Sequence, residues 1–185
     1  MTKNWSQQLP MYATYSRIVL APCLMLVLYL NFKYSGLVAT ILFVVASLTD
    51  WLDGYWARKY NAESPMGKFM DPIADKIIVL AALIMLLYKN DVDPIMVFIL
   101  LARDIFIGGI RAVAATNQVV IAAKPFGKWK TAIQMVAIPC MFINEIFTLP
   151  LGLWGYWALW VSVILSLISG VEYTWGYYTG RQERK

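Results

Sequence analysis

From Gly36 to Arg58 the chain reads GLVATILFVVASLTDWLDGYWAR, an apolar run that ends in two aspartates, Asp50 and Asp53. A helix needs about 20 apolar residues to cross a bilayer, and this run is long enough. Continuous apolar runs are typical of helices, whereas a membrane β-barrel shows alternating segments of about ten residues. Similar runs lie at 10–32, 70–89, 94–116, 126–147 and 152–178. The sequence therefore predicts an all-α integral membrane protein, a bundle of six transmembrane helices.

The composition of the whole chain fits one membrane domain. Of its 185 residues, 60% are hydrophobic and 15% are charged, against roughly 45–50% and about 25% in soluble domains. We therefore expect a single domain over residues 1–185. The chain has no histidine, which excludes a Ser-His-Asp triad and a His-ligated metal. Cys23 and Cys140 stand apart in apolar runs, which predicts small buried side chains rather than a disulfide or a thiolate metal site.

The basic residues predict how the bundle is oriented. Lys33 and Lys89 fall on one predicted side and Arg103 falls near mid-depth, while all other Lys and Arg lie toward the opposite side. By the positive-inside rule, both termini and the loops 59–69 and 117–125 are expected to be cytoplasmic. The first apolar segment shows no small-x-small cleavage site and is expected to be retained. We expect a multi-pass protein of the cell (inner) membrane, and no nucleic-acid binding, because the cations edge a membrane.

Four aspartates are clustered on the second and third predicted helices. At about 100° per residue, Asp50 and Asp53 share one face of their helix, and Asp71 and Asp75 are about 40° apart on the next. Asp50 lies ~21 Å along its helix, below the cytoplasmic surface of a ~30 Å core. Both pairs enter from the cytoplasmic side. The sequence thus predicts that they face each other across a polar cavity open to the cytosol.

Such a cluster needs compensating positive charge. An ionised carboxylate inside a membrane costs at least ~2.5–3.5 kcal/mol on insertion scales. One source of compensation is ion pairing with Arg58, Lys68 and Lys76. The favoured source is two divalent cations, Mg²⁺ or Mn²⁺, since all the donors are oxygens and such ions can clamp a phosphoryl group. Gly54 and Ala57 on the same face would let a bulky ligand approach the backbone, although close helix packing explains small residues equally well.

The spacing of these residues resembles a family signature. Asp50-x-x-Asp53-Gly54-x-x-Ala57-Arg58, eight intervening residues and then Gly67-x-x-x-Asp71-x-x-x-Asp75 resembles the signature of the CDP-alcohol phosphatidyltransferase family. The resemblance implies a six-helix bundle, usually a homodimer, that transfers a phosphatidyl group from CDP-diacylglycerol to an alcohol and releases CMP.

The same resemblance implies roles for individual residues. Asp50, Asp53 and Asp71 would ligand the metals with help from Asp75, and Asp75 would also be the general base that deprotonates the alcohol. The CDP moiety would be held by Gly54, Ala57, Arg58, Gly67 and Thr14. A serine or cysteine nucleophile beside a base is not evident, so direct displacement is favoured over a covalent intermediate.

Further positions resemble the branch of the family whose acceptor is sn-glycerol 3-phosphate and whose product is phosphatidylglycerophosphate. They are Pro10, Thr14, Arg17 and Pro22, Arg103-Asp104 and Arg111, and Gly127-Lys128-x-Lys130-Thr131-x-x-Gln134-Met135. Two positions depart from that branch, Leu9 where Asn is common and Asp104 where Glu is usual.

A dianionic phosphate calls for several cations in one pocket. We expect Arg103, Arg111, Lys130 and Lys128 to hold it, although snorkelling at the membrane edge also explains the lysines. Arg103 near mid-depth is costly unless it pairs with Asp104 or faces a polar cavity.

Other functions remain compatible with the sequence. The same chemistry could act on serine, inositol or phosphatidylglycerol. A different class, a divalent-cation transporter, could use the four acids as an ion path. Against a transporter stand the small size of the chain and the absence of repeated halves. A non-catalytic scaffold does not explain the acids.

Overall fold

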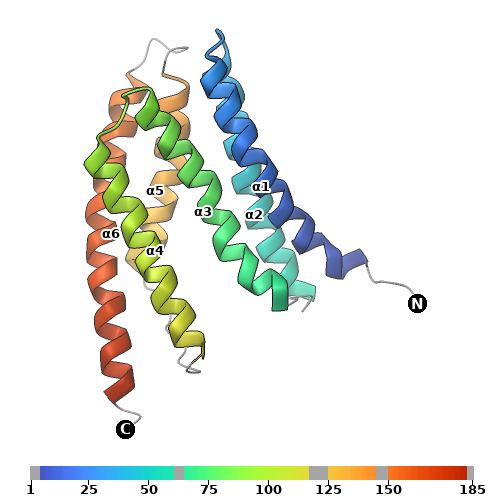
Figure 1. The fold of residues 1–185 in the computed structure, drawn as a ribbon, viewed down its shortest axis with the longest axis vertical. Coiled ribbons are helices and arrows are strands. Elements are labelled where there is room, and N and C mark those ends of the chain that lie inside the picture. Colours follow the sequence, from blue (N-terminus) through green and yellow to red (C-terminus); the bar gives the residue numbers. More distant parts are fainter. Residues whose placement is uncertain (1–4, 61–64, 117–124, 145–149, 183–185) are drawn as a thin grey trace.

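The computed structural model describes residues 5–60, 65–116, 125–144 and 150–182, and over these residues every regular element is a helix (Figure 1). Side chains are described for residues 15–49, 76–110, 113, 126–144 and 150–176. The prediction of an all-α fold is confirmed. The helices are α1 (Trp5–Leu30), α2 (Ser35–Tyr60), α3 (Pro65–Tyr88), α4 (Pro94–Thr116), α5 (Pro125–Phe142) and α6 (Leu151–Gln182).

The helix boundaries follow local chemistry. Three helices begin at a proline, α3, α4 and α5, where the missing N–H costs nothing. Asn31 and Asn90 follow the ends of α1 and α3 with φ of 45° and 61°, the left-handed conformation that Asn tolerates after a helix. The fifth helix ends at Phe142 and not at the predicted residue 147. Asn144 explains the difference, because its Oδ1 accepts a 2.7 Å hydrogen bond from the Gly152 N–H at the start of α6.

Three other boundaries differ from the prediction by more than two residues. α1 begins at Trp5 instead of residue 10, α3 begins at Pro65 instead of residue 70, and α6 runs on to Gln182 instead of residue 178. Each extra stretch contains polar residues. A hydropathy pattern marks the apolar part of a helix, and a helix continues beyond that part wherever its backbone hydrogen bonds do.

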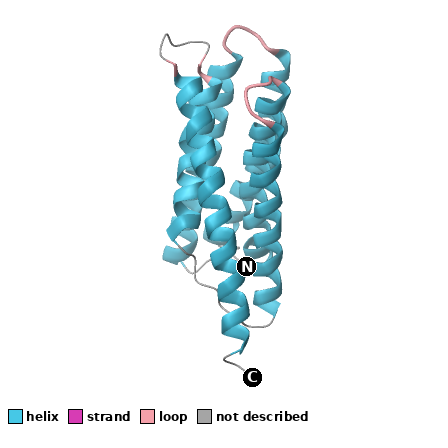
Figure 2. Cartoon of the chain, turned by 90° about the vertical axis from the view of Figure 1, so that its left-hand side faces the viewer, coloured by secondary structure: helices cyan, strands magenta, loops and turns pink. Residues whose placement is uncertain are grey.

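The six helices form two groups of three. α1 packs against α2 and α3, and α6 packs against α5 and α4. The groups meet through contacts of α2 with α5, of α3 with α4 and of α3 with α5. In Figure 1 they lie close together at the upper end and diverge toward the lower end, which carries the C-terminus. Figure 2 shows from the side that the helices run roughly along one common direction.

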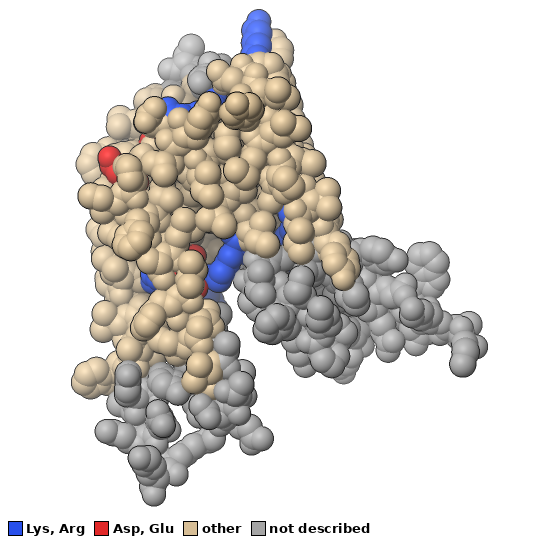
Figure 3. All heavy atoms as spheres, in the orientation of Figure 1, with Lys and Arg blue, Asp and Glu red and all other residues tan. Residues whose placement is uncertain are grey.

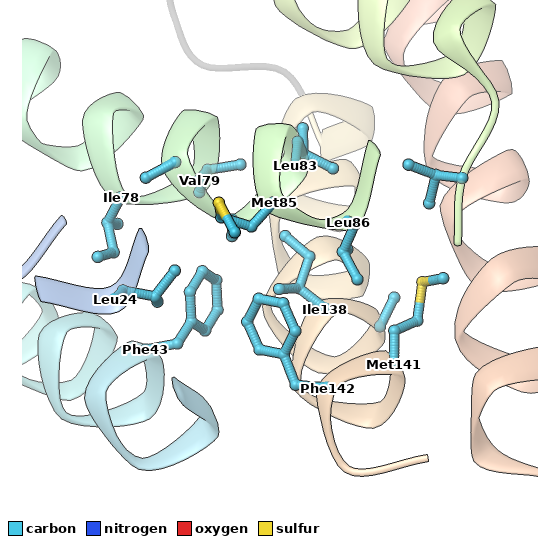
Figure 4. Close-up of a cluster of buried hydrophobic side chains, with 14 of the residues drawn as sticks. Leu24, Phe43, Ile78, Val79, Leu83, Met85, Leu86, Ile138, Met141 and Phe142 are labelled. Atoms are coloured by element: carbon cyan, nitrogen blue, oxygen red, sulfur yellow. The ribbon is translucent and has the colours of Figure 1, made fainter. Parts of the chain in front are cut away.

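A hydrophobic core joins the two groups at the upper end. Figure 4 shows Phe43 of α2 beside Phe142 of α5, with ring centroids 6.5 Å apart and planes at 82°. Leu24 of α1, Leu86 of α3 and Ile138 of α5 complete the cluster and are fully buried. This packing fixes α2, α3 and α5 relative to one another, and these helices carry most of the residues with predicted roles.

Among the described glycines, Gly36 has the closest neighbour, because a Cβ atom there would overlap the carbonyl oxygen of Phe142. We expect Gly36→Ala to lower the free energy of unfolding by about 1–3 kcal/mol, because overpacking forces the backbones of α2 and α5 apart. The matched control is Gly108→Ala, since a Cβ at Gly108 meets nothing within 4 Å. Thermal unfolding of both variants in detergent measures the difference. Equal melting temperatures would contradict the contact.

The outer surface is rich in large apolar side chains. Phe98, Ile105, Trp154 and Trp175 are all at least 70% exposed. Among the described residues, one stretch of α6, Leu151–Gly176, is long and apolar enough to cross a membrane, with a mean hydropathy of 1.8. Shorter apolar stretches lie in α1, α2 and α3 at Tyr15–Leu30, Ser35–Thr49 and Lys76–Tyr88.

The two cysteines are both free thiols. Cys23 is exposed and Cys140 is half-buried, so the expectation that both are buried was wrong. Cys23 lies within the apolar part of α1, where an exposed apolar side chain is common on this molecule.

Candidate active site

Three cations from three helices converge on one carboxylate, Asp104 of α4. The Lys130 ammonium of α5 lies 2.5 Å from Asp104 Oδ1, and Arg103 Nη1 lies 3.0 Å from the same oxygen. Lys76 of α3 lies 3.6 Å from Oδ2. We call Lys76, Arg103, Asp104 and Lys130 the Asp104 cluster. With three positive charges and one negative charge, the cluster has a formal charge of +2.

Arg103 also connects the Asp104 cluster to α6. Its Nε donates to the Ser166 carbonyl oxygen at 3.2 Å, and its Nη2 donates to the Ser169 hydroxyl. Ser166 and Ser169 are fully buried. A guanidinium has five N–H donors, and these contacts together with the Asp104 bond use three of them. The guanidinium is therefore fixed in orientation while it keeps donors for a ligand.

Burial within the cluster is uneven. Lys130 is 1% exposed, and the side chains of Arg103 and Asp104 are 12% and 15% exposed. The Lys76 side chain is 41% exposed. In the space-filling view, the molecule is hollowed between the diverging groups, and charged atoms of both signs line the upper part of the hollow (Figure 3). The cluster thus has a buried side toward α5 and an open side toward α3.

The structure brings together two of the predicted acceptor residues, Arg103 and Lys130. Arg103 pairs with Asp104, one of the two arrangements expected for it from the sequence. Lys128 is exposed, which follows from its place two residues before the buried Lys130, since such neighbours point in different directions from a helix. Arg111 lies on α4 about two turns beyond Arg103, and its side chain is outside the described residues.

The signature residues lie on two helices that contact each other. Asp50, Asp53, Gly54, Ala57 and Arg58 belong to the second half of α2, and Gly67, Asp71 and Asp75 belong to the first half of α3. Thr14 lies on α1. The side chains of all these residues are outside the described part of the chain.

Described contacts nevertheless set the level of the acidic segments along the bundle. Asp75 directly precedes Lys76, whose ammonium reaches Asp104. On α2, the Ser47 hydroxyl lies 3.2 Å from the Met135 sulfur of α5, and Asp50 follows Ser47 by about one helical turn. Lys130 precedes Met135 by little more than one turn on the antiparallel α5. Both acidic segments therefore reach the level of the Asp104 cluster.

The residues that fit a metal are the four signature aspartates. They offer only oxygen donors, which suits Mg²⁺ or Mn²⁺ and not a soft metal. Among the side chains that the structure describes, no group of three or more His, Cys, Asp or Glu could hold a metal ion. The aspartates, on two contacting helices at the level of the Asp104 cluster, remain the fitting donor set.

Three residues that contact Arg103 or Asp104 were not expected at the acceptor site from the sequence: Lys76, Ser166 and Ser169. Gln134 is part of the sequence pattern shared with the glycerol 3-phosphate branch, but no role was predicted for it. Ser162, Ser166 and Ser169 are spaced four and three residues apart in an apolar helix, and such a buried polar face is a signal that could have indicated a site. Gln134 is buried one turn beyond Lys130, and its Nε2 finds no hydrogen-bond partner among the described residues.

Comparison with known proteins shows which family the chain belongs to. Residues 7–168 match the model of the CDP-alcohol phosphatidyltransferase family. The chain is 39% identical to the CDP-diacylglycerol–glycerol-3-phosphate 3-phosphatidyltransferase of Rickettsia bellii, over 90% of this chain and 93% of the relative. It is 37% identical to the protein of the same name from Bacillus subtilis, over 89% of this chain and 92% of the relative. The chain therefore belongs to the CDP-alcohol phosphatidyltransferase family.

Proposed function

We propose that this protein transfers the phosphatidyl group of CDP-diacylglycerol to sn-glycerol 3-phosphate, giving phosphatidylglycerophosphate and CMP. The relatives from Rickettsia bellii and Bacillus subtilis are named for this reaction. The structural observation that carries the proposal is the Asp104 cluster. Its formal charge of +2 matches a dianionic phosphate, and serine and inositol offer no such group.

The acceptor phosphate is bound by Arg103 and Lys130, with Arg111 contributing from further along α4. Arg103 offers a planar set of donors to two phosphate oxygens, and Lys130 supplies a compact charge. Lys128 is exposed, so we place it at the rim of this pocket. In this pose the primary hydroxyl of the acceptor points toward the acidic segments of α2 and α3.

The donor is bound by the signature. Gly54, Ala57, Gly67 and Thr14 line the place of the CDP moiety, and the Arg58 guanidinium holds its phosphates. Asp50, Asp53, Asp71 and Asp75 would hold two divalent cations, Mg²⁺ or Mn²⁺, which when bound neutralise the diphosphate and polarise its β-phosphorus. The outer faces, with their exposed apolar side chains, contact membrane lipid.

The transfer is a single displacement. Asp75 takes the proton of the acceptor hydroxyl, and the resulting oxygen bonds to the β-phosphorus of CDP-diacylglycerol. The bond from that phosphorus to the bridging oxygen breaks, and CMP leaves with the bonding electron pair. Arg58 stabilises the charge that develops on CMP. No nucleophile from the protein is required.

We further propose a single domain over residues 1–185 that spans the membrane six times, with both termini and the active site on the cytoplasmic side, and that forms a homodimer. The exposed apolar side chains on the helices support contact with lipid. The six helices have short connections, and the strong bias of Lys and Arg toward one side supports the orientation.

The test is CMP release by the purified protein given CDP-diacylglycerol and Mg²⁺ or Mn²⁺, with glycerol 3-phosphate, serine, inositol and phosphatidylglycerol compared as acceptors. We expect activity with glycerol 3-phosphate and its loss on chelation of the metal. Preference for another acceptor would overturn the assignment of glycerol 3-phosphate as the acceptor and would leave the family assignment unchanged. Divalent-cation flux into vesicles without CMP release would instead support a transporter.

Arg58→Lys keeps the charge and tests the donor site. We expect the KM for CDP-diacylglycerol to rise by about tenfold, because an ammonium cannot bind two phosphate oxygens side by side as a guanidinium does. The measurement is CMP release at varied CDP-diacylglycerol, with Lys33→Arg at the opposite end of the bundle as the control. A donor KM equal to that of the parent would show that Arg58 lies outside the donor site.

A further inference from the structure

The position of the Asp104 carboxylate indicates that it binds neighbouring side chains and not a ligand. Its Oδ1 accepts from both Arg103 and Lys130, at 3.0 and 2.5 Å. These are the two described side chains to which we assign the acceptor phosphate. A carboxylate would repel that phosphate, so Asp104 must serve the cations and not the substrate.

We propose that Asp104 is a positioning residue that holds Arg103 and Lys130 in one fixed arrangement and thereby sets the affinity for the phosphate of the acceptor. This inference rests on the proposed function. It adds that selectivity for a phosphorylated acceptor depends on an acid that does not contact it.

The need for such a residue follows from Lys130. A lysine side chain has a flexible four-carbon stem and loses rotamer entropy when it is fixed. Lys130 is 1% exposed, so its charge requires a partner inside the protein. In the described structure that partner is Asp104, which holds the ammonium beside the guanidinium despite the repulsion between the two cations.

Arg103 is held on two sides. The buried serines of α6 fix its Nε and Nη2, and Asp104 fixes its Nη1. Among the described residues, the Lys130 ammonium donates to Asp104 and has no second support comparable to the α6 serines. Loss of the carboxylate should therefore displace Lys130 more than Arg103. The ion pair between Lys76 and Asp104 is the weakest of the three, because its N–O distance is 3.6 Å and the Lys76 side chain is 41% exposed.

The test compares Asp104→Asn, Asp104→Glu and Asp93→Asn in steady-state assays of CMP release. We expect Asp104→Asn to raise the KM for glycerol 3-phosphate by about tenfold, with the donor KM unchanged, because a charge-assisted contact is lost only in the acceptor pocket. Asp104→Glu keeps the charge and should restore the acceptor KM to within about threefold. Asp93 accepts a hydrogen bond from the Tyr156 hydroxyl at the other end of the bundle. Asp93→Asn is therefore the matched control and should behave as the parent.

A double variant separates positioning from general stability. If Asp104 acts through Lys130, the effects of Asp104→Asn and Lys130→Met on the acceptor KM should be less than multiplicative. Multiplicative effects, or a change in melting temperature with an unchanged acceptor KM, would overturn the proposal. Such results would leave the proposed function intact as long as the parent uses glycerol 3-phosphate. A parent that does not use this acceptor would refute the function, and this inference with it.

Discussion

Asp75→Asn is expected to reduce turnover by about 10²- to 10⁴-fold while the protein still binds CDP-diacylglycerol, because the amide cannot accept the proton of the attacking hydroxyl. Asp75 directly precedes Lys76, which reaches the Asp104 cluster. The backbone thus places the proposed base at the level of the proposed acceptor phosphate. The assay is CMP release at saturating donor and acceptor, and donor binding is measured separately by protection against thermal unfolding.

The control for this variant is again Asp93→Asn, which removes a carboxylate far from the acidic segments. The pH profile adds a second readout, since loss of a base removes the acidic limb of the rate profile. Turnover above about a tenth of the parental value would be too fast for an enzyme that has lost its general base. Loss of donor binding together with turnover would make Asp75 chiefly a metal ligand.

Lys130→Met is expected to raise the KM for glycerol 3-phosphate by about tenfold to a hundredfold, with little change in the donor KM. Removing one cation from a charge-assisted phosphate site costs ~1.5–3 kcal/mol. Methionine keeps much of the buried apolar volume at this position, so α5 should still pack. The measurement is CMP release at varied glycerol 3-phosphate.

Lys128→Met tests whether the effect on the acceptor KM requires a buried lysine or only a lysine close to the Asp104 cluster. Lys128 is exposed and Lys130 is buried, so we expect Lys128→Met to change the acceptor KM by less than about threefold, in the range of a surface charge. Lys33→Met at the opposite end serves as the neutral reference. Equal effects of Lys128→Met and Lys130→Met would place the acceptor phosphate at the rim and outside the Asp104 cluster.

The sequence predicted the helices well because their apolar runs are long and unbroken. The fourth helix was predicted at 94–116 and forms at Pro94–Thr116. The fifth was predicted too long, because the apolar pattern continues past Phe142 while Asn144 already bonds to the next helix. A hydropathy pattern cannot detect that the Asn144 side chain accepts a hydrogen bond from the Gly152 N–H at the start of the next helix.

The candidate site could be predicted only in part. Arg103 and Lys130 were predicted to share a pocket, and the structure brings them together on Asp104. The motif also included Lys128, because spacing along the chain does not show which of two lysines points inward. Lys76 was considered as a partner for the aspartates of the signature, and its described partner is Asp104. That pairing depends on how α3 crosses α4, which no local pattern encodes. The roles of the signature residues stay predictions.

The contact between α2 and α5 has a consequence for how the chain is made. The Thr40 hydroxyl donates to the Pro139 carbonyl oxygen at 3.4 Å, across 99 residues of sequence. Ribosomes add about 5–20 residues per second, so the contacting part of α5 is synthesised roughly 5–20 s after that of α2. α1, α2 and α3 contact one another and can associate during that interval. In the membrane topology proposed above, lipid or the insertion machinery covers the face of α2 that later meets Phe142, and the order of synthesis sets the order of assembly.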